Sequence, residues 1–200
     1  MDNYYNPIVD IVFCFNVINF MRDCIEDVKK NALNFKNDFL EALKEAGKGC
    51  SGDIRTKVIA FGDERIGKKL LVSPFFTLPE QEKEFQTFIN GLTAEEGCDK
   101  PQSAYEALIE AFKSDWVKEG PKRRWITVML TDSSAHTERF TDLVDAWNAL
   151  NHNFKRLLLF APYHSSWDVF VSQGYNILWL ESSRIKLGFN VIIENIVTMV

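Results

Sequence analysis

Short apolar runs alternate with amphipathic stretches along nearly the whole of this 200-residue chain. Most of the runs are continuous rather than alternating, as expected for strands that are covered on both faces. The predicted strands span residues 11–15, 56–61, 69–72, 126–130, 156–160 and 176–180. This alternation predicts an α/β domain of the doubly wound, Rossmann-like kind, with a central, mostly parallel six-stranded sheet and helices on both faces.

The segments between the strands carry apolar residues at steps of three or four, which is the period of a helix with one buried face. The predicted helical stripes span residues 21–43, 85–92, 105–116, 140–150 and 191–199, and Gly47 is the predicted end of the first. The run at 69–72 follows its predecessor after a polar connection that is too short for a crossover helix. It is therefore predicted to be an antiparallel edge strand. Since no repeat or linker interrupts the pattern, residues 1–200 are predicted to form a single domain.

Charge and cysteine content restrict the class of function. The net charge is -5, and a basic surface of the kind that nucleic acid requires is not expected from the short run Lys122–Arg124. None of the four cysteines forms a C-x-x-C pair. The N-terminus has no basic signal-peptide region, and no apolar run is long enough for a membrane helix. These features predict a cytoplasmic protein without nucleic-acid or membrane partners.

Three polar segments follow predicted strands or precede a predicted helix, at residues 16–20, 95–103 and 130–136. In an open parallel sheet, the loops at the carboxyl ends of central strands converge on one crevice. We therefore expect these three segments to meet. The segment after residue 160, PYHSSWD, is predicted to be an aromatic loop near the rim of the same crevice, with Tyr163, His164 and Trp167.

The three segments resemble those of a von Willebrand factor A domain, and the resemblance extends from about residue 10 to the last residue. It is closest to the intracellular bacterial A-domain proteins found beside tellurite-resistance and stress-signalling genes. Thr131, Asp132 and His136 match the T-D-x-x-x-H loop of that group. Asp99 and Ser103 match its G-G-G-D-x-P-E-S loop. The resemblance implies a metal-ion-dependent adhesion site for Mg²⁺ or Mn²⁺, completed by a carboxylate of a protein partner.

The first loop departs from the D-x-[ST]-x-S signature of the group. Asn16 stands in place of the aspartate, Ile18 and Phe20 in place of the two hydroxyl residues, and Asn19 in place of a glycine. Mg²⁺ requires hard oxygen ligands, and the side chains of Ile18 and Phe20 have none. These substitutions predict a degenerate metal site. Two explanations stay open: the crevice is a closed version that needs no ion, or the metal ligands were lost by drift because nothing selected for them.

Few oxygen donors remain at the positions of the family site. Asp99 and Asp132 are the remaining candidate metal ligands, with Ser133, Asn19 and His136 at the rim. No cofactor is predicted, and a weak Mg²⁺ site at the two aspartates is the alternative.

The predicted function is that of a non-catalytic interaction or scaffold module that holds a protein partner. There is no G-x-S-x-G elbow and no phosphate-binding lysine loop of the form G-x-x-x-x-G-K-[ST]. Two alternatives stay open. One is a metal-dependent adhesion module, and the other is a hydrolase that uses Asp132 and His136.

Overall fold

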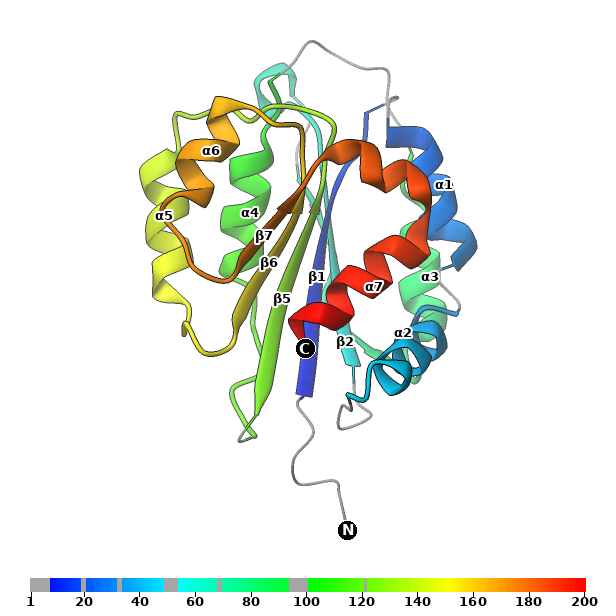
Figure 1. Cartoon of the computed structure of the whole chain (residues 1–200). Coiled ribbons are helices and arrows are strands. Elements are labelled where there is room, and N and C mark those ends of the chain that lie inside the picture. The colour runs from blue at the N-terminus through cyan, green and yellow to red at the C-terminus, as the bar shows by residue number, and fades with distance from the viewer. Residues whose placement is uncertain are drawn as a thin grey trace.

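Figure 1 shows the computed structural model, which describes residues 8–18, 21–31, 34–48, 54–67, 70–93, 101–120 and 122–200. Within these ranges the strands are β1 (Ile8–Asn16), β2 (Ile54–Phe61), β3 (Leu71–Val72), β4 (Phe76–Leu78), β5 (Arg123–Leu130), β6 (Lys155–Phe160) and β7 (Ile177–Leu180). The α-helices are α1 (Arg22–Asn31), α2 (Phe35–Glu45), α3 (Glu82–Asn90), α4 (Ala104–Phe112), α5 (Phe140–Ala149), α6 (Ser165–Val171) and α7 (Phe189–Met199). Two 3-10 helices are η2 (Glu64–Ile66) and η3 (Ser182–Leu187).

The sheet has the order β3-β2-β1-β5-β6-β7, and β4 pairs with β2 beside β3. Strand β1 lies at its centre and pairs in parallel with β2 and β5, so that Phe13 stands opposite both Val58 and Val128. Strands β6 and β7 continue the parallel part. This arrangement confirms the predicted α/β fold with a mostly parallel sheet.

Helices cover both faces of the sheet: α1, α2, α3 and α7 lie on one face, and α4, α5 and α6 on the other (Figure 1). Side chains of β1 alternate between the two layers. Phe13 and Phe15 belong to the core under the first group of helices, whereas Val12 and Cys14 belong to the core under the second. Because both layers are apolar, the strand reads as one continuous apolar run.

The antiparallel edge of the sheet differs in detail from the prediction. Leu71 and Val72 do pair antiparallel with β2, while residue 69 lies outside the described residues. A second short strand, β4, also pairs antiparallel with β2, which gives seven strands rather than six. Ser73, Pro74 and Phe75 separate the two pieces. The hydroxyl of Ser73 accepts the Val58 N–H (2.9 Å) in place of a backbone carbonyl, and Pro74 has no N–H to donate.

The apolar stripe predicted as one helix over residues 21–43 forms two helices, α1 and α2. The stripe does not reveal the break because Val28, Phe35 and Phe39 all face the same core. Gly47 does end α2: its φ is +67°, and the N–H groups of Gly47 and Lys48 bond back to the carbonyls of Lys44 and Leu43. None of the helices in the described ranges is long and apolar enough to cross a lipid bilayer.

Candidate functional site

The described parts of the three predicted segments meet at the carboxyl edge of the sheet, which is the upper edge in Figure 1. Gln102 donates its backbone N–H to the Ser134 carbonyl (3.0 Å), and His136 donates its own to the Gln102 carbonyl (3.0 Å). Ser103 bonds to the carbonyl of Gly62, just after β2 (3.1 Å). These bonds, together with those of Asn16 described next, confirm the expected convergence for residue 16 and for the segments 101–103 and 130–136. The remainder of the second segment, residues 95–100, lies outside the described residues.

Asn16 is the last residue of β1 and is completely buried. Its side-chain nitrogen lies 3.2 Å from Oγ1 of Thr131, 3.4 Å from Oδ1 of Asp132 and 3.4 Å from Oγ of Ser133. An amide NH₂ has two hydrogens, so it serves two of these three acceptors at a time. A single neutral donor thus joins the end of β1 to the loop after β5.

The loop after β5 also holds itself in place. The Ser133 N–H donates to Oγ1 of Thr131 (3.1 Å), and the Ser133 hydroxyl donates to Oδ1 of Asp132 (3.2 Å). Thr131 and Ser133 are fully buried. The oxygen of the Asn16 amide is buried and has no hydrogen-bond partner among the described residues. The opposite orientation of the amide would set that oxygen against the Asp132 carboxylate.

The other predicted site residues are distributed as follows. Ile18 is 2% exposed and so belongs to the interior rather than to an open crevice. Asn19, Phe20 and Asp99 lie outside the described residues. Asp132 is half-buried and lines a neighbouring groove. Among the described residues of the predicted site, it is therefore the acidic one that reaches the surface.

The residues that the structure describes do not form a ligand set for Mg²⁺. That ion takes about six oxygen ligands in octahedral geometry. The hydrogens of the Asn16 amide instead point at the oxygens of Thr131, Asp132 and Ser133, and Ile18 supplies no donor atom. Within the described ranges, no group of three or more His, Cys, Asp or Glu side chains is placed to hold a metal ion.

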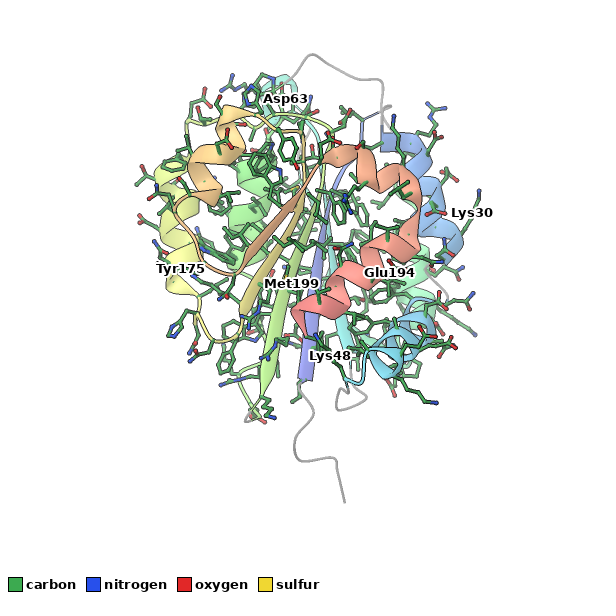
Figure 2. The ribbon with its side chains drawn as sticks, in the orientation of Figure 1. Lys30, Lys48, Asp63, Tyr175, Glu194 and Met199 are labelled. Carbon is green, nitrogen blue, oxygen red and sulfur yellow. The ribbon has the colours of Figure 1, made fainter. Side chains whose placement is uncertain are left out.

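His136 is held by an acidic residue whose role the sequence did not reveal. Its Nε2 lies 3.3 Å from Oδ1 of Asp63, and both residues are buried. Asp63 follows β2 and also accepts the backbone N–H of Arg65 (3.0 Å) at the start of η2. It is labelled at the top of Figure 2, at the same edge as the converging loops. The position of Asp63 directly after a central strand was the signal that could have identified it.

The predicted aromatic loop PYHSSWD is wrong as a description of this segment. Residues from Ser165 onward form α6, with His164 as its N-cap. Trp167 is completely buried and donates its indole N–H to the Ser133 carbonyl (3.1 Å), whereas Tyr163 is 71% exposed. Trp167 therefore faces the interior and stabilises the loop after β5 by this hydrogen bond. Tyr163 is the aromatic side chain of this segment that stays exposed.

A groove of about 660 Å³ opens beside Asp132, between α1, η3 and the ends of the parallel strands. Its lining includes Met21 and Ile185, which are buried, and Leu187, which is 67% exposed. Its charged residues are Asp23, Asp27, Asp132, Glu181 and Lys186. Two of the carboxylates also cap helices: Asp27 accepts the Phe189 N–H (2.6 Å), and Glu181 accepts the Ser183 N–H (2.7 Å). The groove is apolar in its walls and acidic in its charge.

Comparison with solved structures places this fold among known ones. The chain resembles a von Willebrand factor type A protein from Catenulispora acidiphila, with a TM-score of 0.54, 15% identity, and coverage of 94% of this chain and 42% of the other. It also resembles the pilus adhesin SpaC from Lactobacillus rhamnosus GG, with a TM-score of 0.58, 10% identity, and coverage of 96% of this chain and 30% of the adhesin. The open conformation of that adhesin gives a TM-score of 0.56 at 9% identity.

These likenesses show a von Willebrand factor A-like fold. The chain spans less than half the length of each of these proteins. No protein-family model matches the sequence, and no curated protein matches it either.

Proposed function

We propose that this chain is an interaction module with a von Willebrand factor A-like fold, that it binds a protein partner at the carboxyl edge of its sheet, and that it does so without a bridging metal ion. The observation that carries the proposal is the amide of Asn16. Its NH₂ group contacts the oxygens of Thr131, Asp132 and Ser133, where the resemblance would place a cation. The module is proposed to be non-catalytic.

The charge of the groove beside Asp132 supports a partner of particular chemistry. In an adhesion site of this type, a cation attracts a carboxylate of the partner. Here the groove carries four carboxylates and one lysine, and a neutral amide replaces the cation. An acidic partner would be repelled, whereas a basic side chain with an apolar stem fits both the charge and the walls. The proposed partner therefore presents a basic segment.

The absence of a metal requirement can be tested by thermal unfolding with and without millimolar Mg²⁺ or Mn²⁺. A ligand at about a hundredfold excess over Kd adds about 2.7 kcal/mol to the free energy of unfolding, so a working site would raise the Tm clearly. We expect the Tm to stay unchanged. The variant Asn16→Asp, Ile18→Ser, Phe20→Ser restores the family ligands and serves as the positive control. A Tm increase in the wild type would overturn the metal-free proposal.

The charge of the partner can be tested with short lysine-rich and glutamate-rich peptides as probes, by calorimetry or fluorescence anisotropy. We expect the lysine-rich peptide alone to bind, and more weakly as salt is added. Asp23→Lys in the first turn of α1 should weaken that binding at least tenfold. Asp38→Lys makes the same change in the first turn of α2, outside the groove, and should leave binding nearly unchanged. An equal loss of peptide affinity in both variants would contradict binding at the groove, because it would show that the peptide responds only to the net charge of the protein.

The setting of the module is proposed from the sequence resemblance to intracellular bacterial A-domain proteins. It is that of a cytoplasmic stress or signalling system. Fractionation of the native host, followed by detection of the chain with an antibody, tests this setting. Recovery from the cell surface would contradict it.

A further inference from the structure

A second cavity, of about 590 Å³, lies at the opposite edge of the sheet, by the amino ends of β6 and β7. It is bordered by the end of α5 and the loop after it, by Lys155 at the start of β6, and by the turn that carries Gly174 and Tyr175. Tyr175, labelled in Figure 2 on the side away from Asp63, is 89% exposed at this turn. The cavity is thus separate from the groove beside Asp132.

Lys155 is a buried cation in the wall of this cavity, only 6% exposed. Its Nζ donates to the Trp147 carbonyl in the last turn of α5 (2.6 Å) and lies 4.3 Å from the centre of the Trp147 ring. Within the described part of the chain, Lys155 forms no ion pair. Burial lowers the pKa of its amine from the ordinary value, since no carboxylate compensates the charge. An anion in the cavity would supply that compensation.

The indole N–H of Trp147 is a second unsatisfied donor in the same wall. Trp147 is 1% exposed, and its Nε1 has no hydrogen-bond partner among the described residues. A buried donor without an acceptor costs about 1–3 kcal/mol. The nearest wall of the cavity is Gly174, where a Cβ would lie 2.7 Å from this nitrogen. A Cβ would also lie 2.7 Å from Cδ1 of Ile177, so glycine at this position allows the turn to approach the indole N–H closely.

The rest of the lining offers donors and no negative charge. No aspartate or glutamate is among the described residues that border the cavity. The side chains of Asn148, Asn151, His152 and Gln173 can each donate a hydrogen bond. A cavity with a buried ammonium, an unpaired indole N–H and no carboxylate has the chemistry of an oxyanion site.

We infer that this cavity binds a small oxyanion, a carboxylate or a phosphate, with Lys155 as its counter-ion and the Trp147 indole N–H as a hydrogen-bond donor. The same lysine also stabilises the end of α5, because its cation lies at the negative pole of the helix. A test must therefore separate anion binding from this structural contribution. The inference does not depend on the function proposed for the opposite edge.

The first test measures the Tm in the presence of inorganic phosphate or of succinate. Each is compared with chloride at equal ionic strength. We expect the Tm to rise saturably with at least one of the two probes. The probe that binds more tightly shows whether the natural ligand is a phosphate or a carboxylate. Lys155→Gln keeps a donor for the Trp147 carbonyl but removes the charge, and should weaken the probe's affinity at least tenfold. Gly174→Ala, whose Cβ would lie 2.7 Å from the indole nitrogen and from Cδ1 of Ile177 and so push the indole away, should have a similar effect.

Nuclear magnetic resonance on the wild type provides a second test that does not depend on the folding of any variant. The indole N–H signal of Trp147 should shift as the probe is added, whereas that of Trp167, already bonded to the Ser133 carbonyl at the opposite edge, should not. Two outcomes would overturn the inference. One is an unmoved Trp147 signal with no Tm rise for either probe. The other is a Tm rise that is equal in the wild type and Lys155→Gln, which would indicate an adventitious ion only.

Discussion

At the end of β1, the side-chain nitrogen of Asn16 lies within hydrogen-bonding distance of three residues that are more than a hundred positions away in the sequence. A carboxylate at this position could accept from the Thr131 and Ser133 hydroxyls, but it could not donate to Asp132. It would accept hydrogen bonds rather than donate them, and its charge would lie beside that of Asp132. The chemical difference between NH₂ and O⁻ at one buried atom thus decides whether the crevice closes without an ion.

The first prediction concerns this amide. Asn16→Asp, studied in the presence of a chelator, should lower the free energy of unfolding by about 3 kcal/mol, because it buries a charge that has no cation. Urea denaturation followed by circular dichroism measures the loss. Asn31→Asp is the matched control. Its amide also bonds to a carboxylate, that of Asp27 (3.2 Å), but in a half-buried place, so its loss should stay below about 1 kcal/mol. Equal losses in the two variants would contradict our account of Asn16.

The second prediction concerns Cys24, which lines the groove beside Asp132. Burial, and to a lesser extent the charge of Asp27, raises the pKa of its thiol from 9.0 to about 12. At pH 8 the thiolate fraction falls from about one in ten to about one in ten thousand, so alkylation should be roughly a thousandfold slower than for a free thiol. The rate of iodoacetamide labelling, read by mass spectrometry in a Cys50→Ser, Cys98→Ser background, measures this. Labelling of the folded chain as fast as in urea would contradict it.

The same shift gives stability a pH dependence with a definite sign. The folded state keeps its thiol protons to a higher pH than the unfolded state, for Cys24 and also for Cys14, whose pKa burial likewise raises. Above pH 9 the unfolded chain loses these protons first, so the stability contributed by the neutral thiols declines as pH rises. For Cys24 the decline should extend to about pH 12. Cys24→Ala should reduce the slope of stability against pH in this alkaline range.

At the scale of single elements, one carboxylate connects two strands and a loop at the amino edge of the sheet. Asp10 on β1 is fully buried and accepts from Nε and from one terminal nitrogen of Arg55 on β2 (2.8 and 2.6 Å). It also accepts the backbone N–H of Val117, in the connection between α4 and β5 (2.7 Å). The hydrogen bond to Asp10 raises the pKa of the Arg55 guanidinium, the direction expected of a true ion pair. Three segments are thereby held in register at the end opposite to the Asn16 site.

The third prediction follows from that arrangement. Asp10→Ala should cost about 3–5 kcal/mol, because it removes the carboxylate that pairs with the Arg55 cation and accepts the Val117 N–H. Asp115→Ala is the control: its carboxylate pairs with Lys118 on the surface (3.3 Å), with both side chains more than four-fifths exposed, so its loss should be within about 0.5 kcal/mol. Urea midpoints of the two variants test the difference. A loss below about 1 kcal/mol for Asp10→Ala would show that the pair is not important for stability.

At the scale of the whole molecule, two helical layers share one sheet, and each layer depends on all of its helices. Helix α7 closes one layer with buried Phe189, Ile192, Ile193 and Ile196. It is tied to α1 by the bond from its first N–H to Asp27, and Lys48, just after α2, donates to its Val197 carbonyl (2.9 Å). Because α7 packs on α1, α2 and β5 at once, its removal would expose apolar surface on all three elements.

The fourth prediction is the effect of its removal. A chain that ends at Gly188 loses five buried apolar side chains of α7, each contributing about 1.5–3 kcal/mol. Their sum, on the order of 10 kcal/mol, equals the whole stability of a typical domain, so the shortened chain should show no cooperative unfolding transition. Near-ultraviolet circular dichroism and urea titration test this. Glu194→Ala, an exposed change on the same helix labelled in Figure 2, should leave the transition unchanged. A native midpoint in the shortened chain would contradict the prediction.

The spacing of apolar residues was sufficient to predict the alternation of strands and helices, the mostly parallel sheet and the edge at which the loops meet. It failed where the path of the chain depends on single hydrogen bonds. The division of the first stripe into α1 and α2, the short strand β4 and the helix α6 all follow turns that leave the apolar period unchanged. Trp167 was predicted to lie in a loop at the rim because it follows the strand at 156–160, although its position in α6 turns it inward.

Apolar periodicity is a property of the linear chain, because burial on one face or on both faces of an element imposes it residue by residue. For this reason the sequence by itself determined the layered α/β architecture. It also showed, by comparison with the family signature, that Asn16, Ile18 and Phe20 replace the usual ligands at the end of the first strand. Hydrogen bonds within about 3.5 Å depend instead on how distant segments meet. Only the tertiary structure decided that the Asn16 amide reaches Thr131 and Ser133, and that His136 pairs with Asp63. The same holds for Lys155, whose buried side chain it placed in the wall of a cavity that has no carboxylate among the described residues that border it.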